Sequence, residues 1–391
     1  MQEFRPNACH HSLEYRDPEA AQALVRRIAE AVESTREYRF MEFCGGHTHV
    51  LARWGLTDLL PANVHMIHGP GCPVCVLPIS RIDMALEVAQ REAVTLCTYA
   101  DLMRVPASRR RTLIQAKAQG ADIRMVTSPL EALQFAKAHP EREVVFFAIG
   151  FETTAPATAA TVKAAAVAGV TNFTILASHV LTIPAVDHVL SGTLGLMGAH
   201  PPTKLNGIVG PAHVSTITGE TPWADVVQRH HIPCVICGFE PLDMLLSIWM
   251  LVRQVNAGEA KLENEFVRGV SEQGNPVAQA LLKEVFVLRE NFTWRGLGVL
   301  PKSALALSPT WQAFDAEERF HLLEKPVLEP QGCACGAILR GDATPLDCRL
   351  FGRVCTPAHP IGACMVSSEG ACAAEWTYGT HDMPVRASGK E

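Results

Sequence analysis

The sequence predicts an α/β protein with two similar parallel-sheet lobes and a cysteine-rich C-terminal region. Three observations lead to this expectation. Short apolar segments recur along the chain, and each runs into a glycine-rich turn and then an amphipathic helix. The tripeptide Gly-Phe-Glu follows two of these segments, at Gly150–Glu152 and Gly238–Glu240. From about Gln331 the composition changes to cysteine, glycine and proline, which marks a third unit.

Six apolar segments are the expected strands, because each is short and bounded by glycine or polar turns. Strands that alternate with helices form parallel sheets, and open parallel sheets carry their sites at the carboxyl ends of the strands. Clusters of Cys, His and Glu fall at those ends here. The expected strands are residues 39–43, 64–67, 144–150, 172–176, 207–210 and 232–237, and the main intervening helices are residues 50–60, 79–90, 155–169, 180–190 and 242–255.

The order of these elements suggests three units. We expect a first lobe at 36–140, which contains the sequences CGGHTH and GPGCPVC, and a second lobe at 141–257, which contains the Gly-Phe-Glu sequences. A charged stretch with weak periodicity begins at Gly258. We therefore expect 258–391 to hold a helical linker and then the cysteine-rich region.

Composition narrows the class of protein. The 391 residues are 48% hydrophobic and 19% charged, which is typical of a folded, soluble chain. A net charge of −6 offers no basic surface for nucleic acid. The polar N-terminus lacks the apolar core of a signal peptide. The most apolar run, Pro241–Val252, is shorter than the about 20 residues that span a bilayer. A cytoplasmic protein without a membrane segment is expected.

The cysteines suggest metal or redox chemistry, because a reducing compartment disfavours structural disulfides. Irregular spacing, interleaved glycines and the absence of a nearby zinc-finger histidine favour a [4Fe–4S] cluster over zinc. Unligated or disulfide-bonded cysteines are the remaining alternative. Because a cubane needs four ligands, two of the six C-terminal cysteines are left for a dithiol beside it. Those six are Cys333, Cys335, Cys348, Cys355, Cys364 and Cys372.

Two N-terminal motifs carry further thiols. Cys44 opens CGGHTH, whose glycines permit close approach to a bound group, and His47 could donate a proton, hydrogen-bond a ligand or coordinate. Cys72 and Cys75 form a CxxC in a proline-rich turn, which is a redox pair or half of a metal site. The plainer alternatives are a helix-capping loop around Cys44 and two buried cysteines in the second motif.

Topology predicts that these two motifs meet. Each follows a strand of a parallel sheet and precedes a helix, so both emerge at the same sheet edge. We therefore expect Cys44 and the Cys72/Cys75 pair in one cleft. The later CxxC, Cys234 and Cys237, lies within an apparent buried strand, where residues three apart face opposite sides. We expect those two cysteines to be small core residues.

Together the motifs resemble the HypD family of [NiFe]-hydrogenase maturation proteins. The resemblance rests on CGGHTH, GPGCPVC, GFETTAP and the array CxC…CRLFGRVCTP…GACMVSSEGAC, from about Phe40 to Cys372. It implies two α/β lobes, a [4Fe–4S] region and a cytosolic scaffold that assembles Fe(CN)2CO. It also implies a HypC-type chaperone as partner and a HypE-type donor of cyanide, which derives from carbamoyl phosphate through a HypF-type enzyme.

The resemblance also assigns roles to residues. Cys44, Cys72 and Cys75 match the family's essential N-terminal cysteines, and we expect Cys44 with Cys72 or Cys75 to hold an iron ion shared with the chaperone. Cys335 and Cys364 match a dithiol or disulfide near the cluster. A cluster-dependent thiol–disulfide oxidoreductase and a binding module with a purely structural cluster stay open as alternatives. The implied cluster ligands are Cys333, Cys348, Cys355 and Cys372.

Overall fold

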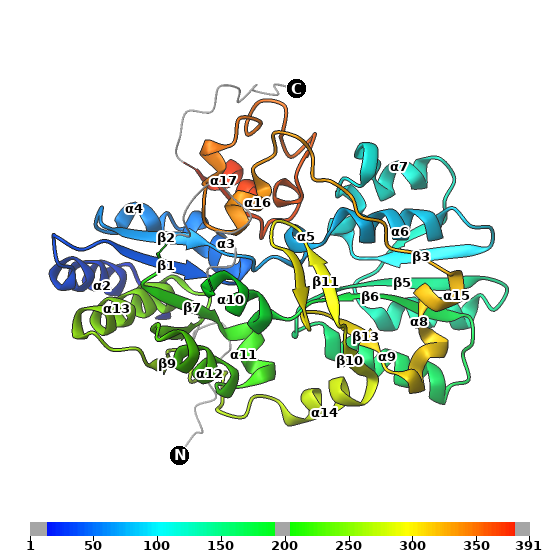
Figure 1. Ribbon diagram of the computed structural model, residues 1–391, viewed down its shortest axis with the longest axis horizontal. Helices are drawn as coiled ribbons and strands as arrows, with labels where there is room; N and C mark the ends of the chain where they lie inside the picture. The colour runs from blue at the N-terminus through cyan, green and yellow to red at the C-terminus, as the bar shows by residue number, and fades with distance from the viewer. Residues whose placement is uncertain (1–13, 192–203, 380–391) are drawn as a thin grey trace, which may run out of the picture.

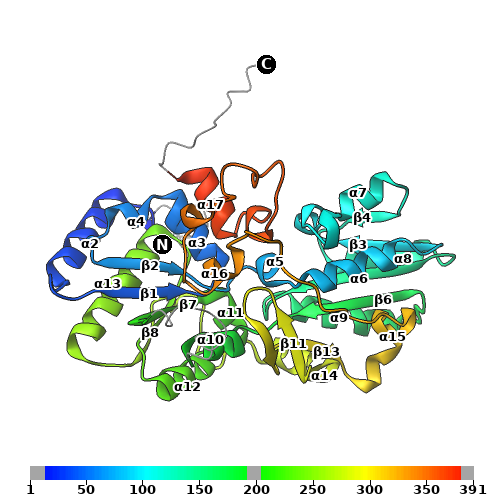
Figure 2. The ribbon, with the colours of Figure 1, turned by 45° about the horizontal axis from the view of Figure 1, so that its top comes forward.

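The computed structural model describes residues 14–191 and 204–379 and has two α/β lobes (Figure 1). The lobes stand side by side, and the C-terminal segment, drawn in orange and red, lies over the first lobe close to the second (Figures 1 and 2). This confirms the predicted parallel α/β architecture with a cysteine-rich C-terminal region. Within the described ranges, no helix combines the length and the apolar character that a membrane span needs.

The first lobe contains a five-stranded parallel sheet with the order β2-β1-β7-β8-β9. Helices α2 and α13 cover one face, where Phe40, Val235 and Leu245 share a core. β1 and β2 pair in register, so that Glu42 stands opposite His68 at their carboxyl ends. The strands are β1 Tyr38–Glu42, β2 Val64–His68, β7 Gly207–Pro211, β8 Cys234–Cys237 and β9 Leu262–Asn264, and the helices are α2 Pro18–Ala31 and α13 Pro241–Ala257.

The second lobe contains a four-stranded parallel sheet with the order β4-β3-β5-β6. Its central strand β5 is almost wholly buried, as expected of a parallel strand covered by helices on both faces. Helices α8, α9 and α14 pack on one side, and α6 lies on the other. The strands are β3 Val94–Thr98, β4 Ile123–Met125, β5 Glu143–Gly150 and β6 Phe173–His179, and the helices are α6 Ile79–Ala89, α8 Pro129–Ala138, α9 Ala155–Val167 and α14 Pro276–Val285.

Strand pairing does not follow the expected division at residue 140. β3 and β4 lie before that boundary but pair with β5 and β6 beyond it, while β7 and β8 return to β1. The chain therefore leaves the first sheet after β2 and re-enters it at β7. Hydrophobic periodicity identifies strands but carries no information on which strands share a sheet, and this is the physical reason for the error. One Gly-Phe-Glu does lie in each lobe.

The segment after α13 differs from the expected helical linker. Besides α14 it forms two antiparallel pairs, β10 with β13 and β11 with β12. The cysteine-rich region then follows with short helices, and its final residues, 380–391, lie outside the described part. These elements are β10 Phe286–Leu288, β11 Asn291–Trp294, β12 Gly298–Pro301, β13 Leu305–Leu307, η4 Pro309–Phe314, α15 Ala316–Phe320, α16 Cys335–Leu339, η5 Pro345–Asp347, η6 Ala363–Met365 and α17 Ala371–Tyr378.

Short helices fill the remaining connections. Several begin at a proline in the first turn, where the missing N–H costs no helical hydrogen bond. Their bounds are α3 Gly45–Arg53, α4 Leu56–Leu59, α5 Pro73–Val76, η1 Ala100–Arg104, η2 Ser108–Arg110, α7 Leu113–Ala118, α10 Thr182–Leu190, α11 Ala212–Thr218 and α12 Thr221–His230.

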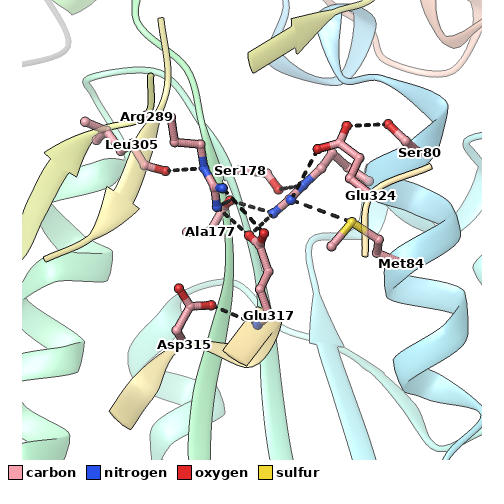
Figure 3. A network of polar contacts seen from close by, with 10 residues as sticks. Ser80, Met84, Ala177, Ser178, Arg289, Leu305, Asp315, Glu317 and Glu324 are labelled. Atoms are coloured by element: carbon pink, nitrogen blue, oxygen red, sulfur yellow. Dashed lines mark hydrogen bonds and ion pairs between the residues drawn. The ribbon is translucent and has the colours of Figure 1, made fainter. Parts of the chain in front are cut away.

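A buried ion-pair network fastens the linker to the second lobe (Figure 3). Arg81 of α6 is fully buried and donates to Glu317 of α15 at 2.7 Å and to the Ala177 carbonyl at 2.7 Å. Its Nε also donates to Ser178 at 3.0 Å. Arg289, just before β11, donates to the same Glu317 carboxylate and to the Ala177 carbonyl. This network fixes the chain that leads into the cysteine-rich region.

Candidate thiol and metal site

Cys44 lies in the loop between β1 and α3. It is the N-cap residue of α3, yet its side chain makes no capping hydrogen bond. The loop is held instead by Glu42, whose carboxylate accepts the Cys44 N–H at 2.8 Å. The sulfur therefore remains available to other groups.

Cys72 and Cys75 lie in a tight turn between β2 and α6. Cys72 is the N-cap of α5, and Pro73 occupies its first position. The two sulfurs form a disulfide. This confirms the expectation that the turn directs both thiols to one point, and it shows the pair in its oxidised form.

The two thiol-bearing loops touch through their backbones. Gly45 N–H donates to the Gly71 carbonyl at 3.2 Å. A Cβ on Gly71 would lie 2.2 Å from the Cys44 nitrogen, which is closer than real contacts allow. The predicted meeting of the two loops is thereby confirmed. Among residues 14–191 and 204–379, however, no three His, Cys, Asp or Glu side chains stand ready as ligands of one metal ion.

Gly71→Ala is expected to push the two loops apart, because no flexible side chain is there to yield to the new methyl group. We expect a loss of about 1–3 kcal/mol in the free energy of unfolding, the range for overpacking. Denaturant unfolding measures it. Gly46→Ala is the comparison, since its added Cβ would meet the Phe239 ring at 2.8 Å, which is a side chain rather than backbone. A Gly71→Ala protein as stable as wild type would contradict the close approach.

His47 is buried beneath Cys44 rather than exposed to a ligand. Its Nε2 lies 3.0 Å from the Cys237 carbonyl oxygen, while Nδ1 has no partner among the described residues. The ring stacks on Phe239, and exposed His213 stacks on the same ring at a centroid distance of 3.7 Å. Burial lowers the pKa of His47, so the ring is a neutral hydrogen-bonding group.

The second CxxC behaves as predicted. Cys234 packs in the core that continues toward the cysteine array, whereas Cys237 packs against the core under α13. Both are fully buried, and they lie on opposite faces of β8. Cys234 and Cys237 therefore do not act as a pair.

The Gly-Phe-Glu carboxylates serve structural contacts. Glu152 is buried and accepts both the N–H and the hydroxyl of Thr182, at 2.8 and 2.9 Å. Glu240 pairs with Arg16 and shares a capping box with Asp243 at the start of α13. Glu240 is therefore a helix-capping residue of α13.

The six C-terminal cysteines gather in one buried cluster of side chains. Cys335 and Cys364 lie with their sulfurs 2.7 Å apart. Burial raises the pKa of Cys372, and nearby Cys335, Cys355, Cys333 and Cys348 raise it further. Although no three of these described side chains converge on one metal ion, an iron–sulfur cluster spreads its thiolate ligands over several iron atoms, and a crowded set of soft sulfur donors suits such a core.

Backbone geometry also suits a thiolate cluster. The Ile361 N–H donates to the Cys355 sulfur at 3.3 Å. A Cβ on Gly362 would lie 2.8 Å from the Cys333 sulfur, so the glycine lets the chain pass close to that thiol. Burial and the neighbouring cysteines raise the pKa of Cys333 to about 12. The Cys333 thiol therefore stays protonated until a metal displaces the proton.

The cysteine array adjoins the N-terminal thiols. α5, which carries the Cys72–Cys75 disulfide, packs against η6, which carries Cys364. α17 packs against α3, and a Cβ on Gly45 would meet the Glu369 side chain at 2.3 Å. Burial first, and then the charge of Glu369, raise the pKa of Cys44 to about 12. Thiols from three distant segments thus converge at the carboxyl ends of β1 and β2.

Sequence reasoning missed four residues around these thiols. Glu42 and His68 hold the two loops, Glu369 covers Cys44, and buried Arg295 donates to the Leu77 carbonyl at 3.0 Å, just after the disulfide. A signal existed for Glu42, since a period of two places it on the buried face of β1 with Phe40. For Glu369 and Arg295 the contacts depend on tertiary packing and leave no local pattern.

This fold and this site define an α/β protein that gathers cysteines from distant segments, an arrangement compatible with a metal cluster. The chain matches the HypD family model, described as the hydrogenase formation hypA family, over residues 19–379, and it belongs to this family of hydrogenase maturation factors. The hydrogenase maturation factor HypD of Rhizobium leguminosarum bv. viciae is 54% identical over 374 residues, covering 95% of this chain and 96% of that protein. The Escherichia coli HypD is 43% identical over 93% of this chain and 97% of its own length.

Proposed function

We propose that this maturation factor is the scaffold on which the Fe(CN)2CO group of [NiFe]-hydrogenase is assembled, together with a HypC-type chaperone and a HypE-type cyanide donor. The observation that carries the proposal is the convergence of the Cys44 loop, the Cys72–Cys75 turn and the cysteine array. Family membership supports the maturation role. The partners follow from the resemblance of the motifs.

The iron ion is the cargo in this proposal, and Cys44 is its principal ligand on this chain. The Cys44 side chain makes no capping bond, so its sulfur can face a metal. Its raised pKa means that binding releases the thiol proton, and affinity should therefore increase with pH. Cys72 or Cys75 becomes a second ligand once the disulfide is reduced. The chaperone completes the coordination.

The cysteine array would hold a [4Fe–4S] cluster through Cys333, Cys348, Cys355 and Cys372. Their crowding and burial support this assignment. When bound, such a cluster supplies one-electron redox chemistry. Cys335 and Cys364 are then free for thiol chemistry beside it.

In this proposal the Cys335/Cys364 pair reduces the Cys72–Cys75 disulfide, and the packing of η6 against α5 supports it. The hydrogen bond from Cys364 lowers the pKa of Cys335, against burial and with help from Arg295, so Cys335 is the attacking thiolate. Attack on the disulfide forms a mixed disulfide and releases one thiolate. Cys364 then attacks the Cys335 sulfur of the mixed disulfide. This forms the Cys335–Cys364 disulfide and releases the second thiolate of the Cys72/Cys75 pair. Two electrons and two protons move, one disulfide forms and one breaks.

Anaerobic infrared spectroscopy of the complex with a HypC-type chaperone tests the scaffold. The wild-type complex is expected to show cyanide and carbonyl stretches, and Cys44→Ala is expected to lose them because the iron has lost its principal ligand here. Cys97→Ala is the matched control, since Cys97 is a buried cysteine in the separate core of the second lobe. Bands of full intensity in Cys44→Ala would refute the assignment of the ligand.

A thiol–disulfide oxidoreductase is the second candidate, favoured by the disulfide of Cys72 and Cys75 and the close Cys335/Cys364 pair. A thiol redox titration separates the candidates when the infrared bands are absent. A two-electron couple at Cys72 and Cys75 would then identify the oxidoreductase. Absence of both signals would leave a binding module with a structural cluster.

A further inference from the structure

Glu42 is a buried carboxylate that joins the two thiol-bearing loops. It ends β1 and is fully buried. Its Oε2 accepts the Cys44 N–H at 2.8 Å, and its Oε1 accepts the Thr48 hydroxyl. Nδ1 of His68, at the end of β2, lies 3.0 Å from the same Oε1. One side chain thus bonds to the loop that carries Cys44 and to the strand that leads into the Cys72 turn.

This arrangement replaces an ordinary helix cap. An N-cap residue usually satisfies the first turn of its helix with its own side-chain oxygen. Cys44 occupies that position in α3 but makes no such bond. Glu42 holds the Cys44 N–H and, through Thr48, the first turn of the helix. The Cys44 sulfur lies near the backbone N–H groups of Gly46 and His47 but forms no disulfide, so it can still bind a metal.

Simple packing does not account for the acid at this position. A buried carboxylate carries a large desolvation cost unless its oxygens are well bonded, and an apolar residue would fill the same core without that cost. Here the oxygens of Glu42 accept three hydrogen bonds, all from the two functional loops. The bonding pattern therefore serves the relative placement of those loops.

His68 connects this assembly to the surface. Its side chain is 30% exposed, whereas that of Glu42 is fully buried. It lines a groove of about 410 Å³ between the first lobe and the cysteine-rich region, whose walls include Met66 and residues 341–347. A substitution of His68 can therefore alter the Cys44 loop, because both contact the Glu42 carboxylate.

We propose that Glu42 is a positioning residue that fixes the Cys44 thiol against the Cys72–Cys75 turn. His68 assists by hydrogen-bonding to the Glu42 carboxylate. The inference rests on the proposed function, because it gives Cys44 its role as a ligand. Glu42 itself does not touch the cargo. It holds the backbone N–H of Cys44, the residue that provides the ligand.

Hydrogen–deuterium exchange and alkylation of Cys44 test this on the purified chain alone. In Glu42→Ala we expect exchange in the peptide spanning residues 43–48 and the rate of Cys44 alkylation by iodoacetamide to rise about tenfold, as for loss of a charge-assisted hydrogen bond. Glu42→Gln keeps an acceptor for the Cys44 N–H, so its rates should stay within about threefold of wild type. His68→Ala should give an intermediate rise.

The chain offers a matched control at the amino ends of β1 and β2. Glu37, just before β1, and His65 of β2 form a similar pair, but that pair is exposed. Glu37→Ala and His65→Ala should leave both readouts unchanged. Combining His68→Ala with Glu42→Ala should add nothing to Glu42→Ala, because the two act through one carboxylate.

Several outcomes would overturn the inference. Unchanged exchange and alkylation in folded Glu42→Ala would make Glu42 a core residue without a positioning role. Equal rises in Glu42→Gln and Glu42→Ala would point to charge rather than geometry. If Glu42→Ala does not fold, His68→Ala and Glu42→Gln decide the matter. Because neither readout needs iron or a partner, absence of the infrared bands from the wild-type complex would count against the proposed function alone.

Discussion

Cys372→Ser is expected to lose most of the iron and sulfide that the anaerobically reconstituted wild-type protein binds, about four of each per chain. Cys372 is buried among four other cysteines, and its raised pKa reflects burial and that crowding. Serine keeps the size of the side chain but offers a hard oxygen in place of a soft thiolate, so the cluster loses a ligand. The same loss is expected for Cys333→Ser, Cys348→Ser and Cys355→Ser.

Iron and sulfide analysis, with visible absorption and electron paramagnetic resonance, measures this result. Cys97→Ser is the control, because Cys97 is buried in the separate core of the second lobe, away from the array. Cys335→Ser and Cys364→Ser should retain the cluster if they form the dithiol. A full cluster in the four expected ligand variants, with loss in these two, would reverse the assignment of ligands.

The six expected strands were predictable because their signals are local, whereas β3 and β4 were not among them. β5 reads as an unbroken apolar run, and the structure buries it on both faces. Each expected strand appears within a few residues of its predicted bounds. The membership of the sheets was not predictable, because an edge such as that of β3 can accept either neighbour. Hydrogen bonding across the sheet, rather than local periodicity, decides that β3 pairs with β5.

The candidate site shows the same difference between features with a local sequence signal and features that depend on tertiary packing. The meeting of the Cys44 and Cys72 loops followed from a topological rule about the carboxyl ends of parallel strands, and the Gly71 contact confirms it. Cys234 and Cys237 were expected to face opposite sides of β8, because side chains alternate between the two faces of a strand. Contacts such as that of Glu369 over Gly45 depend on how a distant segment folds back, which no local pattern encodes.

Glu317→Gln is expected to be the most destabilising of the polar substitutions outside the thiol site. Glu317 accepts from both Arg81 and Arg289, and the Arg81 side chain is fully buried. Removing the negative charge leaves the buried guanidinium with only its longer ion pair, to Glu324 at 3.7 Å. Such breakage costs about 3–5 kcal/mol, and the lower end applies because Arg81 keeps its bonds to Ala177 and Ser178.

Denaturant unfolding with Glu284→Gln as the control measures the difference. Glu284 pairs with Lys163 at 2.7 Å on the surface, where an ion pair contributes about 0–1 kcal/mol. Equal effects of the two substitutions would show that the Arg81 network adds no more than a surface pair. Loss of this anchor should also loosen the segment that leads into the cysteine array, so iron content after reconstitution should fall with stability.

The network also predicts how stability depends on pH. Burial alone would raise the pKa of Glu317, but Arg81 and Arg289 outweigh it and hold the pKa at about 2, below the ordinary 4.5. A depressed carboxyl pKa stabilises the fold above the unfolded value and loses that contribution as pH falls from 4.5 toward 2. The difference in the free energy of unfolding between wild type and Glu317→Gln should therefore shrink as the pH falls across this interval. A difference that stays constant from pH 6 to pH 3 would mean that the glutamine disturbs packing rather than charge.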